Sequence, residues 1–161
     1  MNLSATQIAM FAGAVALALI LGALGFQYIG GYPPCEMCHW QRWPHIAAAV
    51  VGLIGALAIN AGLIDRRYAV PLALLTITLV AVSGAIGVFH AGVEWKFWPG
   101  PSACTSAYVP GQVVDLTNFG HVPMCDRAAW RLFGISMAGY NALISLGTAA
   151  LAAFALSKRT A

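Results

Sequence analysis

Residues 8–29 read "IAMFAGAVALALILGALGFQYI", and this stretch decides the fold of the chain. It has the length that an α-helix needs to cross about 30 Å of hydrocarbon at 1.5 Å per residue. Of the 161 residues of the whole chain, 60% are hydrophobic and 8% are charged, whereas roughly a quarter are charged in an average soluble domain. The sequence therefore predicts a membrane protein.

Three more apolar runs cover residues 45–64, 69–91 and 132–156. All four runs are rich in Gly, Ala and Ser, and such small residues let transmembrane helices approach each other closely. We expect the first run to be a retained anchor and not a cleaved signal peptide, because "MNLSATQ" before it has no Lys or Arg. The prediction is an all-α membrane protein, a four-helix transmembrane bundle forming one domain over residues 1–161.

The positive charges indicate how this bundle is oriented. Arg66 and Arg67 occupy the short turn between the second and third runs, and a Lys-Arg pair follows the fourth run. The positive-inside rule then puts this turn and both termini in the cytoplasm. Two loops, residues 30–44 and 92–131, are left on the other side, which we predict to be the periplasm of a bacterial inner membrane.

All four cysteines fall in these two outer loops. Cys35 and Cys38 lie in the first loop, and Cys104 and Cys125 lie in the second. Disulfides persist in oxidising compartments such as the periplasm. An even set of thiols on this side therefore indicates that the cysteines form disulfide pairs. For a membrane protein of this kind we expect no nucleic-acid partner.

The first pair lies in "CEMCHWQRW", residues 35–43, which has two interpretations. With His39 it is a c-type haem attachment motif, and without it a redox-active dithiol. If the segment is helical, Cys35, Cys38 and Arg42 share one face, and a cation beside a thiol favours the reactive thiolate. Arg42 could instead anchor the helix at the membrane interface.

Two metal-containing alternatives are weaker. Haem would consume both thiols, needs more covering than a short loop offers, and leaves Cys104 and Cys125 without a role. A zinc site of four cysteines normally shows two closely spaced pairs, whereas the second pair here is widely separated. We predict no metal, and a membrane-anchored c-type cytochrome using Cys35-x-x-Cys38-His39 stays as the alternative function.

The second pair could simply staple the long loop. Beside another dithiol, however, it could also relay electrons, because thiolate attack on a disulfide moves the cross-link from one pair of cysteines to another. No glycine-rich nucleotide fingerprint is visible, so the expected final acceptor is a lipid-soluble quinone. His90, near the outer end of the third run, could give it a hydrogen bond or a proton, or could be an ordinary interfacial histidine.

These motifs together resemble the DsbB family of disulfide bond formation proteins. The resemblance covers most of the chain and is carried by "PPCEMCHWQRW", "WPGPSAC" and "PMCDRAAWRLFGISMAGYN". It implies a protein-dithiol:quinone oxidoreductase of the bacterial inner membrane. Two differences concern the first motif: residue 39 is His, and Gln41 stands where the best-known member has an acid.

The resemblance also implies how electrons move. A reduced periplasmic thioredoxin-fold protein, similar to DsbA, would attack a Cys104–Cys125 disulfide and form a mixed disulfide with Cys104. Cys125 would then exchange with Cys35 and leave Cys38 as the thiolate that meets the quinone, either ubiquinone or menaquinone.

The same resemblance implies a quinone site. Arg42 matches the family arginine that supports the bound quinone, and His90 lies close to a family histidine near that site. Together with the four cysteines, these are the predicted site residues.

Overall fold

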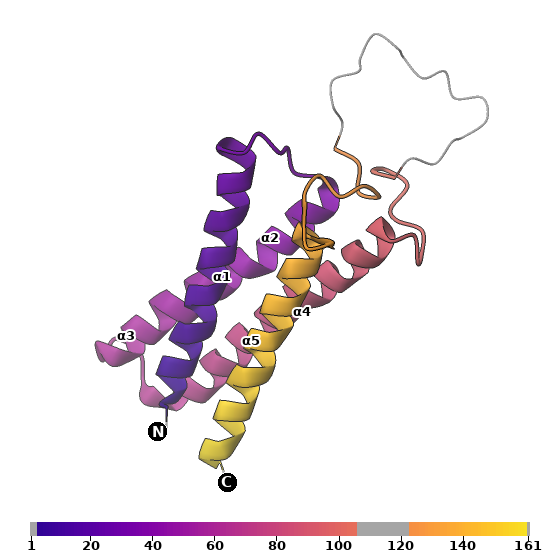
Figure 1. Ribbon diagram of the computed structural model, residues 1–161. Helices are drawn as coiled ribbons and strands as arrows, with labels where there is room; N and C mark the ends of the chain where they lie inside the picture. The colour runs from indigo at the N-terminus through magenta and orange to yellow at the C-terminus, as the bar shows by residue number, and fades with distance from the viewer. Residues whose placement is uncertain (1–2, 106–122, 161) are drawn as a thin grey trace, which may run out of the picture.

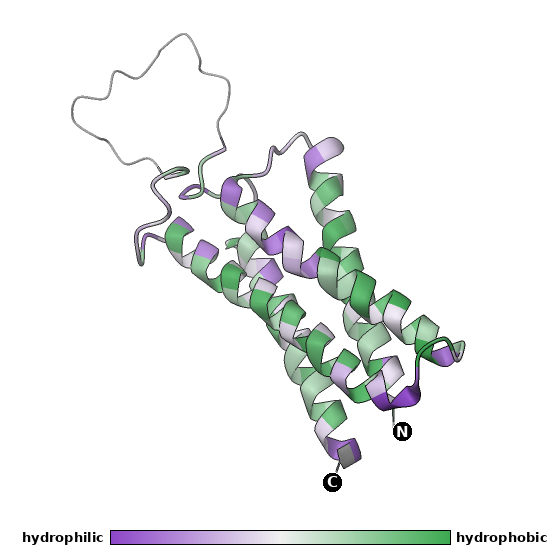
Figure 2. Cartoon of the chain, turned by 180° about the vertical axis from the view of Figure 1, so that it is seen from behind, coloured by the Kyte–Doolittle hydropathy of each residue, from purple (hydrophilic) through white to green (hydrophobic). Residues whose placement is uncertain are grey.

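The computed structural model describes residues 3–105 and 123–160, in which four helical spans are long and apolar enough to cross a membrane (Figure 1). The predicted all-α, four-helix transmembrane fold is confirmed. The hydropathy of the chain agrees with it, because apolar residues run along the helices and polar residues gather toward their ends (Figure 2). The elements are α1 (Ala5–Tyr28), α2 (Glu36–Ala49), the π-helical η1 (Val50–Gly55), α3 (Ala56–Asn60), the 3₁₀ turn η2 (Arg66–Tyr68), α4 (Ala69–Glu94), β1 (Arg131–Leu132), β2 (Ile135–Ser136) and α5 (Met137–Thr160).

The second span begins earlier than predicted, at Glu36 and not at residue 45. Its first turn is stabilised by Cys35, whose sulfur accepts a hydrogen bond of 3.3 Å from the backbone N–H of Cys38. The helix continues through Pro44, which has no N–H and so leaves the Trp40 carbonyl without its usual helical donor. One such lost bond is tolerated in transmembrane helices. The cysteine motif therefore lies on a helix and not in a loop.

The second span also ends earlier than predicted, because α3 stops at Asn60 and not at residue 64. Gly62 follows with a φ of +76°, a left-handed conformation that glycine adopts easily and that commonly ends helices. The turn to the 3₁₀ element η2 contains the arginine pair that the orientation argument used.

Close contact between α1 and η1 depends on two glycines. A Cβ atom added at Gly52 would lie 2.6 Å from the backbone oxygen of Ala9 and 3.0 Å from the Cα of Gly13. The two backbones therefore touch at this crossing, as the richness in small residues predicted.

We expect Gly52→Ala to destabilise the bundle, because the added methyl group meets backbone atoms that cannot rotate away. Overpacking of this kind typically costs about 1–3 kcal/mol. The matched control is Gly25→Ala on α1, where nothing lies within 4 Å of the added atom. Thermal unfolding in detergent measures both variants, and an equal midpoint for the two would contradict the packing described here.

The outer end of the bundle also differs from the predicted boundaries. Helix α4 runs to Glu94, past residue 91, and α5 begins at Met137 and not at residue 132. The reason for the late start is an antiparallel hairpin of β1 and β2. Its two turn residues, Phe133 and Gly134, have φ values of 50° and 80°, and positive φ at both positions is typical of tight hairpin turns.

Both chain termini lie at one end of the bundle, and the described parts of the second loop lie at the other end, near the beginning of α2 (Figure 1). Helices α1 and α4 each pack against the other three spans. This arrangement places the start of α2, the end of α4 and the start of α5 around one volume. The four cysteines belong to this end.

Candidate dithiol–disulfide site

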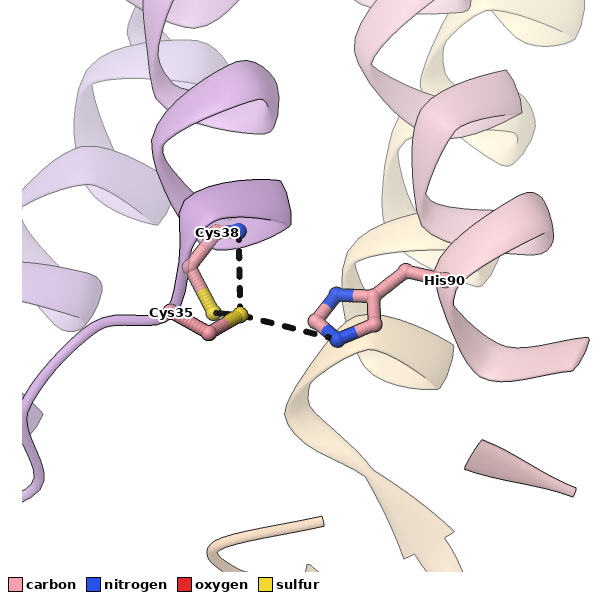
Figure 3. Close-up of side chains that lie close together, drawn as sticks. All are labelled: Cys35, Cys38 and His90. Carbon is pink, nitrogen blue, oxygen red and sulfur yellow. Dashed lines mark hydrogen bonds between the residues drawn. The ribbon is translucent and has the colours of Figure 1, made fainter. Parts of the chain in front are cut away.

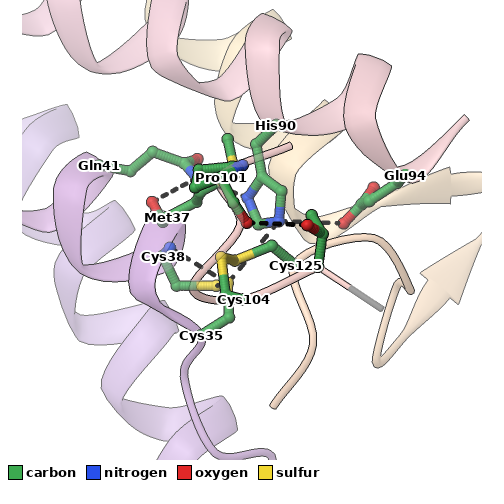
Figure 4. The surroundings of a disulfide bond; sticks show 10 residues. Cys35, Met37, Cys38, Gln41, His90, Glu94, Pro101, Cys104 and Cys125 are labelled. Carbon is green, nitrogen blue, oxygen red and sulfur yellow. Dashed lines mark hydrogen bonds and ion pairs between the residues drawn. A yellow bond between two sulfur atoms is a disulfide. The ribbon is translucent and has the colours of Figure 1, made fainter. Parts of the chain in front are cut away.

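All four cysteines meet in one buried cluster. Cys104 and Cys125 form a disulfide, while Cys35 and Cys38 are thiols whose sulfur atoms lie 2.8 Å apart. The two pairs lie side by side (Figure 4). The side chain of Val93 packs in the same cluster. The Cys104–Cys125 bond does cross-link the loop, and this cross-link lies in contact with the dithiol. Loop and helix thus bring the disulfide and the dithiol into one cluster.

Cys35 is the deeper thiol of its pair, with 5% of its surface exposed. Its pKa is raised well above the ordinary value, first because its thiol is hydrogen-bonded to Cys38 and then because burial disfavours the anion. Cys35 therefore keeps its proton at neutral pH. Its sulfur also lies 3.7 Å from Nε2 of His90 (Figure 3).

His90 stands between the two sulfur pairs. It is 3% exposed, and its Nε2 atom is 3.7 Å from Glu94 Oε1 as well as from the Cys35 sulfur. The backbone of Cys125 is within hydrogen-bonding reach of the same imidazole. The sequence predicted that His90 lies near a quinone. In the structure this side chain lies against the sulfur of Cys35 (Figure 4).

A buried hydrogen-bond network contacts His90 at Nδ1, the ring nitrogen other than the one near the Cys35 sulfur. The Gln41 amide nitrogen lies 2.9 Å from His90 Nδ1 and donates to the Met37 carbonyl at 3.0 Å. Asn141 of α5 donates to Gln41 Oε1 at 2.8 Å, and the Ser83 hydroxyl of α4 donates to the Gln41 carbonyl at 2.8 Å. Three helices are therefore joined at the level of the dithiol.

The network continues to His45, which was not among the predicted site residues. Its Nε2 atom is 2.8 Å from Asn141 Oδ1 and 3.2 Å from the Ser145 hydroxyl. A usable signal was present: polar side chains spaced four residues apart inside apolar spans are expensive in a membrane and face the bundle interior. Gln41 with His45, and Asn141 with Ser145, both have this spacing.

Arg42 does not bond to sulfur. Its guanidinium donates to Gln27 Oε1 at 2.6 Å and to the Ala23 carbonyl at 3.4 Å, both on α1. It nevertheless lines the same cavity as Cys38. The predicted common face of Cys35, Cys38 and Arg42 thus appears as one wall of that cavity.

The cavity has a volume of about 420 Å³, within the range of about 300–1,000 Å³ typical of small-molecule sites. Most of its wall is apolar, and the apolar residues come from α1, from α5 and from the segments that precede α2 and α5. One part of the wall is polar. The polar side chains there include Cys38, Gln41, Arg42, His45, His90 and Asn141.

A metal ion is a chemical alternative for the dithiol. Ligand atoms of Cys35, Cys38 and His90 all lie within 4.8 Å of one another. A metal-bound histidine, however, normally donates its second ring N–H to an acceptor, and here Nδ1 faces the amide nitrogen of Gln41. The surroundings of His90 therefore oppose coordination. The four-cysteine zinc alternative fails as well, because Cys104 and Cys125 are bonded to each other.

The haem interpretation has its histidine in the wrong place. His39 is exposed, whereas Cys35 is buried and both thiols line the cavity. The thiols thus face the interior of the bundle and the second-loop disulfide, away from the histidine that would complete the motif.

Comparisons with known proteins agree with this geometry. The family described as "Disulfide bond formation protein DsbB" matches residues 5–155. A "Disulfide bond formation protein B" of Methylococcus capsulatus is 32% identical over 147 residues, covering 86% of this chain and 84% of the relative. "Disulfide bond formation protein B 2" of Pseudomonas syringae is 28% identical, with 97% and 91% covered. No solved structure matches the chain.

Proposed function

Because the chain belongs to the DsbB family of disulfide bond formation proteins, we propose that it reoxidises a periplasmic dithiol protein of the DsbA type and passes the electrons to a membrane quinone. The family and the four apolar spans make it a multi-pass membrane protein with a disulfide-forming oxidoreductase role. The observation that carries the finer proposal is a dithiol packed against a disulfide beside a cavity that is apolar over most of its wall.

The first half of the cycle is disulfide exchange. A thiolate of the partner attacks the Cys104 sulfur, the Cys104–Cys125 bond breaks, and Cys125 leaves as a thiolate. Cys125 then attacks Cys35 of an oxidised Cys35–Cys38 pair, so that a Cys35–Cys125 bond forms and Cys38 leaves as a thiolate. Their common buried cluster supports this direct transfer.

The second half restores the loop disulfide. The second thiol of the partner resolves the mixed disulfide and releases Cys104, which attacks Cys125 and frees Cys35. The partner now holds a disulfide, and Cys35 and Cys38 hold the two electrons. The described combination, a Cys104–Cys125 disulfide with free Cys35 and Cys38, corresponds to this stage.

A quinone supplies the final oxidation, because it accepts two electrons and two protons as Cys35 and Cys38 close their disulfide. The cavity fits such an acceptor: its apolar wall suits a hydrophobic ring, and Arg42 and His90 bring N–H groups to the polar side. Arg42 carries five N–H donors, of which two are used by α1. These features suit ubiquinone and menaquinone alike.

We further propose that the cysteine end faces the periplasm of the inner membrane, because the exposed arginines of η2 lie at the end that holds the termini. A c-type cytochrome remains chemically conceivable for the Cys-x-x-Cys-His motif alone. The family assignment and the exposed His39 both favour the thiol–quinone function.

Arg42 tests the proposed quinone site. We expect Arg42→Met to raise the KM for quinone about tenfold or more, as for the loss of a charge-assisted hydrogen bond, with a smaller change in kcat. Arg42→Lys keeps the charge but loses the planar fork, so its KM should be intermediate. The assay follows quinone reduction by a reduced DsbA-like protein, with Arg66→Met, at the opposite end of the bundle, as control. An unchanged KM for Arg42→Met would remove Arg42 from the site.

A further inference from the structure

The orientation of the Gln41 side chain is fixed by its neighbours. Its nitrogen faces the Met37 carbonyl, which can only accept a hydrogen bond, and its oxygen faces the nitrogen of Asn141. The Asn141 amide is fixed in turn, because the same nitrogen lies 3.2 Å from the carbonyl of Ser83. If either amide were rotated by 180°, its oxygen would face a carbonyl oxygen and the two could not form a hydrogen bond. The Gln41 nitrogen must be a donor toward every group that it meets.

This orientation determines which nitrogen of His90 carries the proton. Gln41 donates to Nδ1 of His90 across 2.9 Å, so Nδ1 is an acceptor and bears no hydrogen. A neutral imidazole with a bare Nδ1 carries its proton on Nε2. Protonating Nδ1 would set its N–H against the donor of Gln41.

The groups around Nε2 match a donor. They are the sulfur of Cys35 at 3.7 Å and Oε1 of Glu94 at 3.7 Å. A sulfur and a carboxylate are good acceptors for an imidazole N–H.

We propose that Gln41 is a positioning residue that holds His90 as the Nε2–H tautomer, so that His90 offers a hydrogen bond to the Cys35 sulfur and is not a general base. The tautomer follows from the network alone, while its effect on rate rests on the proposed function. In that cycle Cys35 must leave as a thiolate when Cys104 attacks Cys125. An N–H group aimed at the sulfur stabilises this anion.

The charge state of Cys35 makes this help necessary. Burial and its hydrogen bond to Cys38 keep Cys35 protonated in the resting pair, so a Cys35 thiolate is costly unless a donor reaches it. The titratable and charged groups that face this region come from three elements. They are Cys35 at the start of α2, Cys38 and Arg42 on α2, Glu94 on α4, and Arg131 of β1, which acts on Glu94.

Nitrogen NMR of ¹⁵N-histidine-labelled protein in detergent reads the tautomer directly. We expect His90 to show a protonated Nε2 and a bare Nδ1 at pH 7, with its signals assigned by their loss in His90→Gln. Observation of a protonated Nδ1 in the wild-type protein would overturn the inference. This measurement needs neither partner nor quinone, so it stands even if the chain oxidises no DsbA-like protein.

Gln41→Met tests the role of residue 41, because methionine has a similar length but no N–H group to donate to Nδ1. We expect the preference for Nε2–H to be lost, and turnover with the protein partner to fall about tenfold. The matched control is Gln7→Met, the same chemical change at the exposed start of α1. A Gln41→Met protein that keeps Nε2–H alone, or that keeps full turnover with the proton on Nδ1, would refute the proposal.

Discussion

Replacing Cys38 with serine is expected to reduce electron transfer to quinone to the uncatalysed background, whichever thiol donor is used. In the proposed cycle Cys38 is the sulfur that leaves as a thiolate and then closes the pair with Cys35. A serine hydroxyl cannot form a disulfide and is a far weaker nucleophile than a thiolate. No other free thiol is described within residues 3–105 and 123–160 except Cys35, so nothing there can take over.

The measurement is quinone reduction by purified Cys38→Ser protein, with a reduced DsbA-like protein in one series and dithiothreitol in another. Two controls show that the variant is folded: an intact Cys104–Cys125 disulfide by mass spectrometry, and an unfolding midpoint close to that of the wild type. Undiminished turnover in either series would defeat the mechanism.

Removing the loop disulfide should affect the activity with the protein partner and the activity with a small dithiol differently. We expect the double variant Cys104→Ser with Cys125→Ser to lose oxidation of the protein partner, because the partner then has no disulfide to attack. A small dithiol can reach the Cys35–Cys38 pair itself, so its oxidation should persist. Cys38 is partly exposed, whereas both loop cysteines are buried, so the first pair offers a small dithiol a sulfur that it can reach.

The same two assays decide this prediction. Loss of both activities would mean that the second pair is needed for the structure of the site and not for the relay. Retention of both would mean that the partner reacts with the first pair directly. Only selective loss agrees with a two-step transfer, so the double variant distinguishes a relay from a staple.

The fold was predictable because hydrocarbon thickness leaves few choices for apolar runs of this length. The boundaries were harder where local chemistry overrode hydropathy. A thiol serving as N-cap moved the start of the second span to Glu36, and a hairpin turning at Phe133 delayed the fourth helix. Neither feature follows from the average polarity of its segment.

The candidate site also contains residues that the sequence could predict and residues that it could not. Four cysteines, Arg42 and His90 could be selected from motif and spacing, and the structure brings all of them to one end of the bundle. Gln41 and Asn141 were not selected as site residues, because a single amide in an apolar run does not reveal which neighbour it meets. The bonds that orient His90 join residues 49 and 100 positions apart in the chain, and only the folded bundle brings them together.

Pro44 has a consequence for how the chain could work. Because proline has no N–H, one backbone hydrogen bond is missing between the turns that carry the thiols and the rest of their span. A sulfur that is joined first to one neighbour and then to another has to pivot by small amounts during each cycle. A helix that lacks one hydrogen bond bends there at less cost than an unbroken one. In the proposed cycle Pro44 would therefore let the turns that carry the thiols pivot relative to the rest of their span.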